Sequence, residues 1–275
     1  MDPHQHVHRA RLYKLASLAF DRPSDELSAA LERGEFQQQL VESARALESE
    51  ALLEHAETIA EASPTEPAGV DDLATQYSTI FGFEHGGEIS QYEIEYSTGT
   101  VLTSTDTIAD LSGFYNAFGL EKVDGRRDRS DHLCLELEFV SHLALQTAGL
   151  ALDDDKQGVT ILENAQEDFL EDHLGRWIPQ FRTTVEEGTD VAFYRAFAAL
   201  CDELIAADAE RFGAEPTVFP ETPPSPTEHF LGGDEEGDFR CNGCGIDDIP
   251  GQNPSLPNAP GGTNGVDAGR GPGPN

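Results

Sequence analysis

The chain has 275 residues, with 52 acidic and 17 basic side chains and a formal net charge of −35. This excess argues against nucleic-acid binding through a broad basic surface, because phosphates would be repelled. The negative charge is spread along the chain and predicts a halophilic protein adapted to very high salt, where the Debye length falls to about 3 Å and self-repulsion is screened.

The C-terminal part of the chain differs in composition from the rest. Residues 216–275 contain 11 of the 16 prolines and 12 of the 26 glycines. Such a segment buries too little apolar surface to offset the entropy lost on ordering. We therefore expect one folded domain over residues 5–215, followed by a flexible Pro/Gly-rich acidic tail over residues 216–275.

Apolar periodicity in the N-terminal half predicts a series of helices. Residues 5–20 form the first, and Ser24 is placed to cap a short second helix after Pro23. Residues 35–62 contain neither glycine nor proline and are predicted as one long helix. A further helix is predicted over residues 70–81.

The C-terminal half continues in the same way after an irregular, glycine-containing stretch at residues 82–102. Pro179 is expected to break a helix or to open the next one in its first turn. Because no sustained strand pattern occurs, the prediction is an all-α single domain of roughly eight to ten helices. Its later helices cover residues 104–119, 131–149, 154–173 and 190–212.

The sequence offers no sign of export or membrane insertion. Its first residues lack a cationic stretch followed by an apolar run, and its apolar runs are too short to span a bilayer. We therefore expect a cytoplasmic protein. Because neither a phosphate-binding glycine loop nor a nucleophile elbow occurs, we do not expect an enzyme.

The four cysteines are too few for a disulfide framework in a chain of this length. Cys134 and Cys201 fall in apolar helical patterns and are expected to be core thiols. Cys241 and Cys244 form a lone Cys-x-x-Cys in the tail. Zinc takes four ligands, so this pair leaves three alternatives: a zinc site shared between two chains, a redox-active pair, or two reduced thiols in a disordered tail.

A set of large side chains surrounds the irregular stretch. Tyr77, Ile80 and Phe81 lie within one and a half helical turns before it, and Tyr92 and Tyr96 lie within it. Core packing would explain Ile80 and Phe81 equally well. The two later tyrosines sit among polar residues and carry hydroxyl groups that need partners. The set predicts an aromatic-lined groove that could receive an apolar peptide helix.

Asp131 and His132 stand where a charged loop gives way to an almost wholly apolar helix. They could cap that helix, with Asp131 accepting backbone N–H groups and His132 in the first turn. They could instead contact a cationic partner, because a carboxylate pairs well with arginine. His132 and Glu136 share a helix face, yet their spacing is not the Glu-x-x-His of di-iron sites, and no matching second helix is evident.

Five segments, in order, resemble the TorD/DmsD family of cytoplasmic chaperones for molybdoenzymes. The resemblance covers about residues 9–212, and its segments are residues 12–20, 76–81, 91–96, 129–132, and 177–181 together with 193–194. The sequence departs from the family pattern at Gln91 and Arg129, which stand where proline is usual. The resemblance says nothing about the tail.

The resemblance implies a non-catalytic chaperone. Apart from the possible zinc at the Cys-x-x-Cys, we expect no cofactor, and the sequence leaves both a monomer and a homodimer open. The chaperone would bind the catalytic subunit of a molybdopterin-containing oxidoreductase, or its twin-arginine signal peptide, until the cofactor is inserted, and then release it for export. The groove would be lined, as the resemblance implies, by Tyr77, Ile80, Phe81, Tyr92 and Tyr96, with Asp131 and His132 contacting the peptide at its edge.

Two alternatives stay open. Within the family, the protein could be an assembly chaperone of the nitrate-reductase type, which acts independently of export. From another class, it could be a metal-binding or redox adaptor that works through Cys241 and Cys244.

Overall fold

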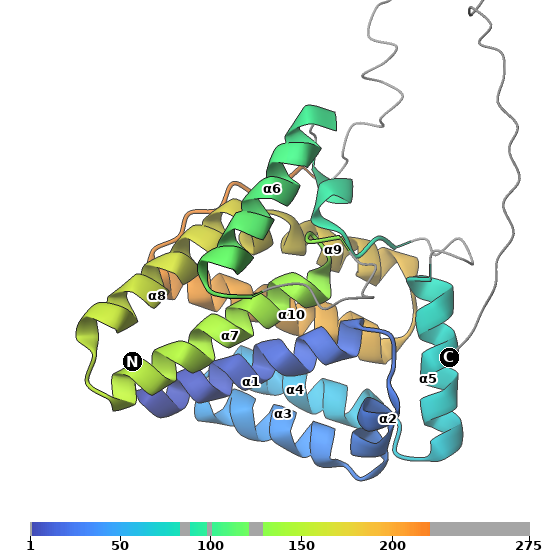
Figure 1. Ribbon diagram of the computed structural model, residues 1–275. Coiled ribbons are helices and arrows are strands. Elements are labelled where there is room, and N and C mark those ends of the chain that lie inside the picture. Colours follow the sequence, from blue (N-terminus) through green and yellow to red (C-terminus); the bar gives the residue numbers. More distant parts are fainter. Residues whose placement is uncertain (1, 83–88, 98–100, 121–128, 221–275) are drawn as a thin grey trace, which may run out of the picture. The chain divides into compact units, whose positions relative to one another are not determined.

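The computed structural model of the protein describes residues 2–82, 89–97, 101–120 and 129–220. This part of the chain is helical, and the prediction of an all-α fold is confirmed. The helices are α1 (Pro3–Phe20), α2 (Asp25–Glu32), α3 (Glu35–Ala46), α4 (Glu50–Ala62), α5 (Pro67–Ile80), α6 (Val101–Ala117), α7 (Leu133–Leu152), α8 (Lys156–Phe169), α9 (Gly175–Gly188) and α10 (Ala192–Phe212) (Figure 1).

Side-chain caps start several of these helices. The Ser24 hydroxyl accepts a hydrogen bond from the Leu27 N–H at 3.2 Å and opens α2, as predicted. Asp155 accepts from the Gly158 N–H at 3.0 Å and opens α8. Each cap satisfies an N–H group that the first helical turn leaves without a partner.

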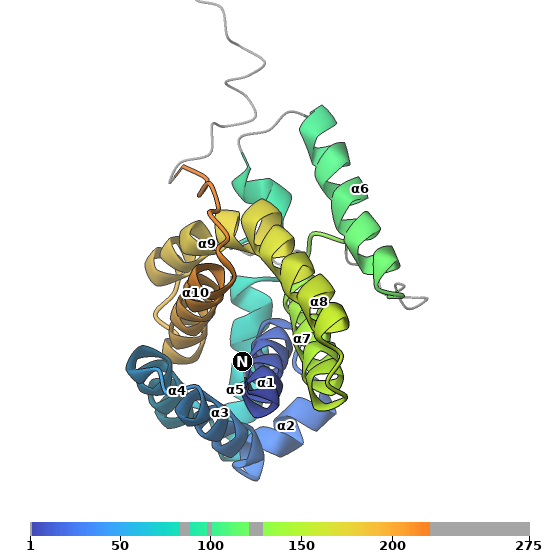
Figure 2. The same ribbon diagram turned by 90° about the vertical axis from the view of Figure 1, so that its left-hand side faces the viewer.

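Helices α1 and α7 pack along each other in the core, and α1 also contacts α3 and α10 (Figure 2). α7 is apolar almost all round, which suits a helix with few solvent-facing positions. Two hydroxyls join the pair: Ser17 donates to the Cys134 carbonyl at 3.0 Å, and Ser141 donates to the Ala10 carbonyl at 2.7 Å. Cys134 and Cys201 are both buried thiols, as expected.

A buried ion pair links the two ends of the folded chain. The Arg9 guanidinium in α1 donates to both carboxylate oxygens of Asp208 in α10, with the shortest contact at 2.6 Å. Gln166 accepts from Arg9 at 3.0 Å, and the Tyr13 hydroxyl donates to Asp208 at 2.9 Å. Because the charges neutralise each other and their hydrogen bonds are made, the pair is tolerated in the core.

The prediction of one long helix over residues 35–62 is wrong. The chain ends α3 at Ala46 and begins α4 at Glu50, with Glu48 in the left-handed region at φ 59°. Ser49 caps α4 through the Leu52 N–H at 3.3 Å. The break lets the chain reverse, so that α3 packs on both α1 and α4, and α4 packs on α10. Tertiary packing thus overrides a run of good helix formers.

Pro179 also behaves differently from the prediction, since it lies inside α9. The irregular turn comes earlier, as the π-helical segment η3 (Leu170–Leu174), which passes directly from α8 into α9. A proline strains the carbonyl four residues before it, here that of Gly175. Gly175 is itself tightly packed, because a Cβ there would lie 2.5 Å from the Leu170 carbonyl oxygen. The widened turn therefore precedes the proline.

Aromatic side chains hold α6 to the bundle. The Phe114 ring lies 5.3 Å from that of Phe169, and the Tyr115 ring lies 5.1 Å from that of Phe139. The Tyr115 hydroxyl donates to the Ser130 carbonyl at 2.8 Å, just before α7. None of the helices in the ranges given above has the length and apolar character needed to cross a lipid bilayer.

The chain after α10 turns back onto α9. The Phe219 N–H donates to the Arg176 carbonyl at 2.8 Å, and the Arg176 guanidinium lies 4.5 Å from the centre of the Phe219 ring. The boundary between domain and tail near residue 215 stays a prediction, since residues 221–275, which hold most of the expected tail, lie outside the described residues.

Candidate functional site

A single antiparallel bridge brings together two of the segments singled out in the sequence. Tyr92 lies opposite His132. The Glu93 N–H donates to the Asp131 carbonyl at 3.0 Å, and the Leu133 N–H donates to the Gln91 carbonyl at 2.8 Å. The bridge fixes the stretch before the short 3-10 helix η2 (Glu93–Tyr96) against the start of α7. Three predicted site residues, Tyr92, Asp131 and His132, therefore lie together.

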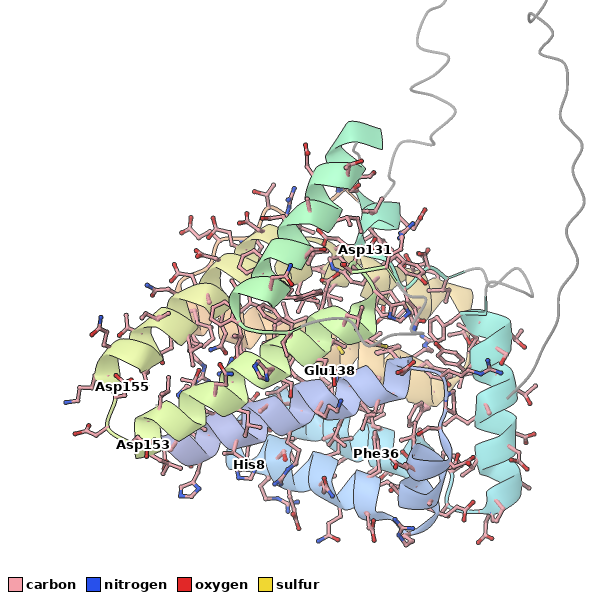
Figure 3. All side chains as sticks on the ribbon, viewed as in Figure 1. His8, Phe36, Asp131, Glu138, Asp153 and Asp155 are labelled. Carbon is pink, nitrogen blue, oxygen red and sulfur yellow. The ribbon has the colours of Figure 1, made fainter. Side chains whose placement is uncertain are left out.

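Asp131 is fully buried and is paired with an arginine of its own chain (Figure 3 labels its position). The Arg129 guanidinium donates to its two carboxylate oxygens at 3.0 and 2.9 Å, and lies 3.4 Å from a Glu95 carboxylate oxygen. The same guanidinium lies 4.4 Å from the centre of the Tyr92 ring. We call Tyr92, Glu95, Arg129 and Asp131 the guanidinium cluster.

His132, and not Asp131, is the residue that caps α7. Its Nδ1 atom accepts from the Cys134 N–H at 3.2 Å, and its ring lies edge-on to Tyr92 with centroids 4.9 Å apart. The Asp131 carboxylate accepts instead from the Ile94 N–H at 3.3 Å and from Arg129. The alternative in which Asp131 caps this helix is wrong, since its carboxylate bonds to Ile94 of η2 and to Arg129 instead.

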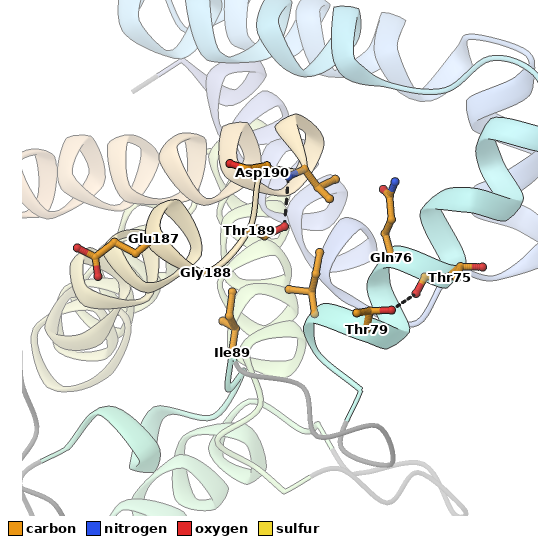
Figure 4. A pocket seen from close by; sticks show the side chains of 10 residues that line it. Thr75, Gln76, Thr79, Ile89, Glu187, Gly188, Thr189 and Asp190 are labelled. Carbon is orange, nitrogen blue, oxygen red and sulfur yellow. Dashed lines mark hydrogen bonds between the residues drawn. The ribbon is translucent and has the colours of Figure 1, made fainter.

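A second site element is a pocket of about 570 Å³ between α5 and the link from α9 to α10 (Figure 4). Ile80 and Ile89 are two of its apolar lining residues, and Glu187 and Asp190 add two carboxylates. Gly188 keeps this wall close, since a Cβ there would lie 2.9 Å from Ile89. Its lining is completed by Thr75, Gln76, Thr79, Thr189 and Val191.

Tyr77 and Gln91 connect the pocket to the guanidinium cluster. The Gln91 side-chain amide donates to the Phe20 carbonyl at 2.7 Å at the end of α1. The Tyr77 hydroxyl lies 3.2 Å from Gln91 Oε1 and 3.3 Å from the Phe20 carbonyl oxygen. This network anchors the stretch between Ile89 and Tyr92, whose two ends belong to the pocket and to the cluster.

Phe81 and Tyr96 point mainly inward. The half-buried Phe81 ring packs edge-on against Tyr194, with centroids 5.2 Å apart. Tyr96 is buried against Trp177 at 5.3 Å, and its hydroxyl donates to the Ser90 carbonyl at 2.7 Å. Burial raises the pKa of Tyr96 above its usual value. Both side chains therefore pack against the core of the bundle and stabilise the segments that carry the site.

Buried acids lie beneath the bridge. Glu136 accepts from the Trp177 indole N–H at 3.1 Å through one oxygen, while its other oxygen has no hydrogen-bond partner among the described residues. Burial, together with the charge of Glu93, raises the pKa of Glu136 well above its usual value. His173 Nδ1 lies 3.0 Å from Glu93, and its Nε2 lies 3.3 Å from Asp110 in α6.

The structure thus divides the predicted residues into groups. Ile80 lines the pocket, Tyr92, Asp131 and His132 meet at the bridge, and Tyr77 lies between the two. Sequence reasoning missed Ile89, and noted Gln91 and Arg129 only as departures from a pattern; local sequence carries no sign of their pairing. Cys241 and Cys244 lie outside the described residues. In the part of the chain that the structure covers, no cluster of three or more His, Cys, Asp or Glu could hold a metal ion.

An all-helical bundle that holds a pocket of mixed polar and apolar lining and an arginine-carboxylate cluster belongs to the class of helical binding proteins. A family profile described as nitrate reductase delta subunit matches residues 42–183, a range that includes the pocket-lining part of α5, the bridge and the guanidinium cluster. The chain belongs to this family, the TorD-like chaperones of molybdoenzyme maturation.

Curated relatives agree with the family. The chain is 32% identical over 149 residues to the chlorate reductase assembly chaperone protein of Ideonella dechloratans, which covers 54% of this chain and 74% of that protein. It is 32% identical over 155 residues to the selenate reductase assembly chaperone protein of Thauera selenatis, covering 54% and 77%. The chaperone protein TorD of Photobacterium profundum is 30% identical over 138 residues, covering 50% and 62%.

Proposed function

We propose that this chaperone binds the catalytic subunit of a molybdopterin-containing oxidoreductase in the cytoplasm through its twin-arginine signal peptide. It holds the subunit until the cofactor is inserted, releases it for export, and catalyses no reaction itself. The names of the relatives support an oxidoreductase client, because two are assembly chaperones of chlorate and selenate reductases.

The observation that carries the proposal is the continuity between pocket and cluster. Ile89 lines the pocket, and Tyr92, three residues on, is in the guanidinium cluster. Three extended residues span about 10 Å. A twin-arginine signal peptide has two arginines followed by an apolar stretch. Its arginines would lie at the carboxylates of the cluster while its apolar stretch enters the pocket against Ile80 and Ile89.

Electrostatics favour the binding of a cationic peptide. Glu187 and Asp190 line the pocket, and Glu95 and Asp131 lie in the cluster. With a net charge of −35 over the whole chain, the surrounding field attracts a cationic peptide and raises its rate of encounter. High salt screens this attraction over distance, so the close contacts matter most.

Each predicted residue has a part in this proposal. Ile80 contacts the apolar stretch of the peptide, and Tyr77 positions the segment from Ile89 to Tyr92. His132 fixes the Tyr92 ring and, with Asp131, contacts the peptide at its arginine end. Phe81 and Tyr96, which pack inward, hold the walls in place.

The test is calorimetric titration of the full chain with the twin-arginine signal peptide of a molybdoenzyme encoded beside it. We expect saturable binding that weakens with a twin-lysine peptide and with the Asp131→Ala/His132→Ala variant. Ile80→Asp should abolish binding, because it puts a charge on the apolar wall of the pocket. Ile161→Asp is the matched control, since Ile161 is 55% exposed on α8. Equal binding by the wild type, Ile80→Asp and Asp131→Ala/His132→Ala would contradict the site.

A second candidate is an assembly chaperone that acts independently of export. The description of the matching family, nitrate reductase delta subunit, favours it. In that case the protein would bind the cofactor-free catalytic subunit equally well with and without a signal peptide. Pull-down with the two forms of the subunit distinguishes the candidates, since the first requires the peptide and the second does not.

A further inference from the structure

The guanidinium cluster contains two kinds of group that proteins use to recognise an arginine side chain, carboxylates and an aromatic ring. Asp131 takes the paired N–H groups of Arg129 at 3.0 and 2.9 Å, Glu95 adds a second carboxylate at 3.4 Å, and the Tyr92 ring supplies an aromatic face at 4.4 Å. Paired donation to a carboxylate and stacking on a ring are properties of guanidinium that an ammonium lacks.

Asp131 and Arg129 differ in burial, which would allow another guanidinium to replace that of Arg129. The Asp131 side chain is 0% exposed, whereas the Arg129 side chain that covers it is 45% exposed. Only Ser130 separates them in the chain, so no helix has to move for Arg129 to leave. Rotation of its own side chain would carry the guanidinium into solvent and release both Asp131 oxygens from their arginine partner.

We propose that this cluster is a binding site for an arginine side chain of the client peptide, and that Arg129 fills the site until the peptide displaces it. The inference rests on the proposed function, which it deepens by naming the group recognised and the competitor. Asp131 keeps a guanidinium partner before and after the exchange, so a buried carboxylate is not left without a counter-charge. Arg129 moves to water, where its charge is well solvated.

The exchange would make the site select arginine over lysine and would lower its apparent affinity for clients. A lysine of the client cannot restore both hydrogen bonds to Asp131, so it displaces Arg129 poorly. The internal competitor also lowers the apparent affinity for every client by the fraction of chains in which it occupies the site. Release of a finished client is thereby assisted by a side chain that is always present.

The experiment measures peptide affinity after removal of the competitor. We expect Arg129→Ala to bind the twin-arginine peptide about tenfold more tightly than the wild type, with a larger preference for arginine over lysine. Arg129→Lys, which keeps the charge and loses the paired geometry, should fall between them. Arg33→Ala is the charge-matched control, because Arg33 pairs with Glu35 at 2.9 Å on the exposed end of α2.

A second probe separates this inference from the function it rests on. N-acetyl-arginine amide should bind Arg129→Ala and not Arg129→Ala/Asp131→Asn, with circular dichroism confirming that both variants fold. If the small probe binds but no signal peptide does, the arginine site stands and the signal-peptide function falls. If the wild type binds peptide and Arg129→Ala binds it no more tightly, the inference is overturned while the function stands. Failure of Arg129→Ala to bind either probe also overturns the inference.

Discussion

Arg9 keeps its charge in the middle of the bundle because its donors are met by Asp208 and Gln166. Tyr13 donates to the same carboxylate, and burial raises the pKa of Tyr13 well above its usual value, so its proton stays on the hydroxyl. At the scale of the single residue, a fully paired group of this kind contrasts with Glu136, one of whose oxygens has no partner among the described residues.

Removing one member of the paired group should cost far more than replacing both members. We expect Arg9→Ala to lower the free energy of unfolding by about 3–5 kcal/mol, because it leaves the buried Asp208 carboxylate with only the more distant Arg211 guanidinium, at 3.5 Å. The Arg9→Met/Asp208→Leu variant should lose much less, since it buries no charge. Urea unfolding at pH 7.5 measures both. A double variant as unstable as Arg9→Ala would contradict this account.

The buried carboxyl group of Glu136 should make the stability of the fold depend on pH. Burial and Glu93 raise its folded-state pKa, so the folded protein holds a proton that the unfolded chain gives up above about pH 4.5. This contribution to stability is present in full below that pH and is lost as pH rises toward the folded-state pKa. Glu136→Gln, which can still accept from Trp177, should therefore raise Tm at pH 8 and leave it nearly unchanged at pH 4.

Thermal melts of Glu136→Gln across that range are the check. Each kcal/mol gained corresponds to roughly 2–4 °C in Tm for a domain of this size. A Tm difference that is constant between pH 4 and pH 8 would show that the substitution acts through packing and not through the proton.

At the scale of the element, the connection between α3 and α4 contains a strained residue. Glu48 holds a positive φ of 59°, which costs a side-chain-bearing residue about 1 kcal/mol or more. The chain accepts this strain because the reversal lets α3 and α4 pack against each other. The strain is local and can be removed without touching the core.

Glu48→Gly should raise the free energy of unfolding by about 0.5–1 kcal/mol, since glycine adopts the left-handed conformation freely. Glu54→Gly, at an exposed position inside α4, should instead lower it by about 1 kcal/mol. Parallel denaturant titrations compare the two. The same loss in both variants would mean that the connection is not strained.

The elements predicted correctly from the sequence are those with strong apolar periodicity. The helices expected over residues 5–20, 70–81 and 190–212 correspond to α1, α5 and α10, and Ser24 caps α2 as expected. The break after α3 was missed because every residue there is a tolerable helix former and only Ser49 hints at a new start. The position of Pro179 inside α9 was not predicted, because the π-helical turn that joins α8 directly to α9 has no signature in local sequence.

The sequence singled out several residues that the structure places close together, but it did not indicate their partners. Motif residues such as Tyr92 and His132 stand out in the sequence, and the structure brings them together. Their partners do not stand out, because Gln91 binds the Phe20 carbonyl and Arg129 stacks on Tyr92 across gaps of many residues. Pairing between distant segments is decided by packing, which a single sequence does not display.

At the scale of the whole molecule, charge sets the conditions under which the fold is stable. With 52 acidic and 17 basic residues, repulsion among carboxylates opposes compaction at low ionic strength. We expect Tm at pH 7.5 to rise by about 10 °C or more between 0.1 M and 2 M KCl as this repulsion is screened. The rise should shrink near pH 4, where many carboxylates gain protons. An equal salt effect at both pH values would indicate surface exclusion and not charge.

The pairing of Arg9 with Asp208 has a consequence for how the protein is made. The two residues are 199 positions apart, so α1 leaves the ribosome long before its counter-charge is synthesised. At 5–20 residues per second the wait is about 10–40 s. The same holds for α7, the main partner of α1, which comes after α6. During that time the first helix of the nascent chain exposes its apolar face, so this chaperone itself depends on completion of synthesis, or on another chaperone, to close its core.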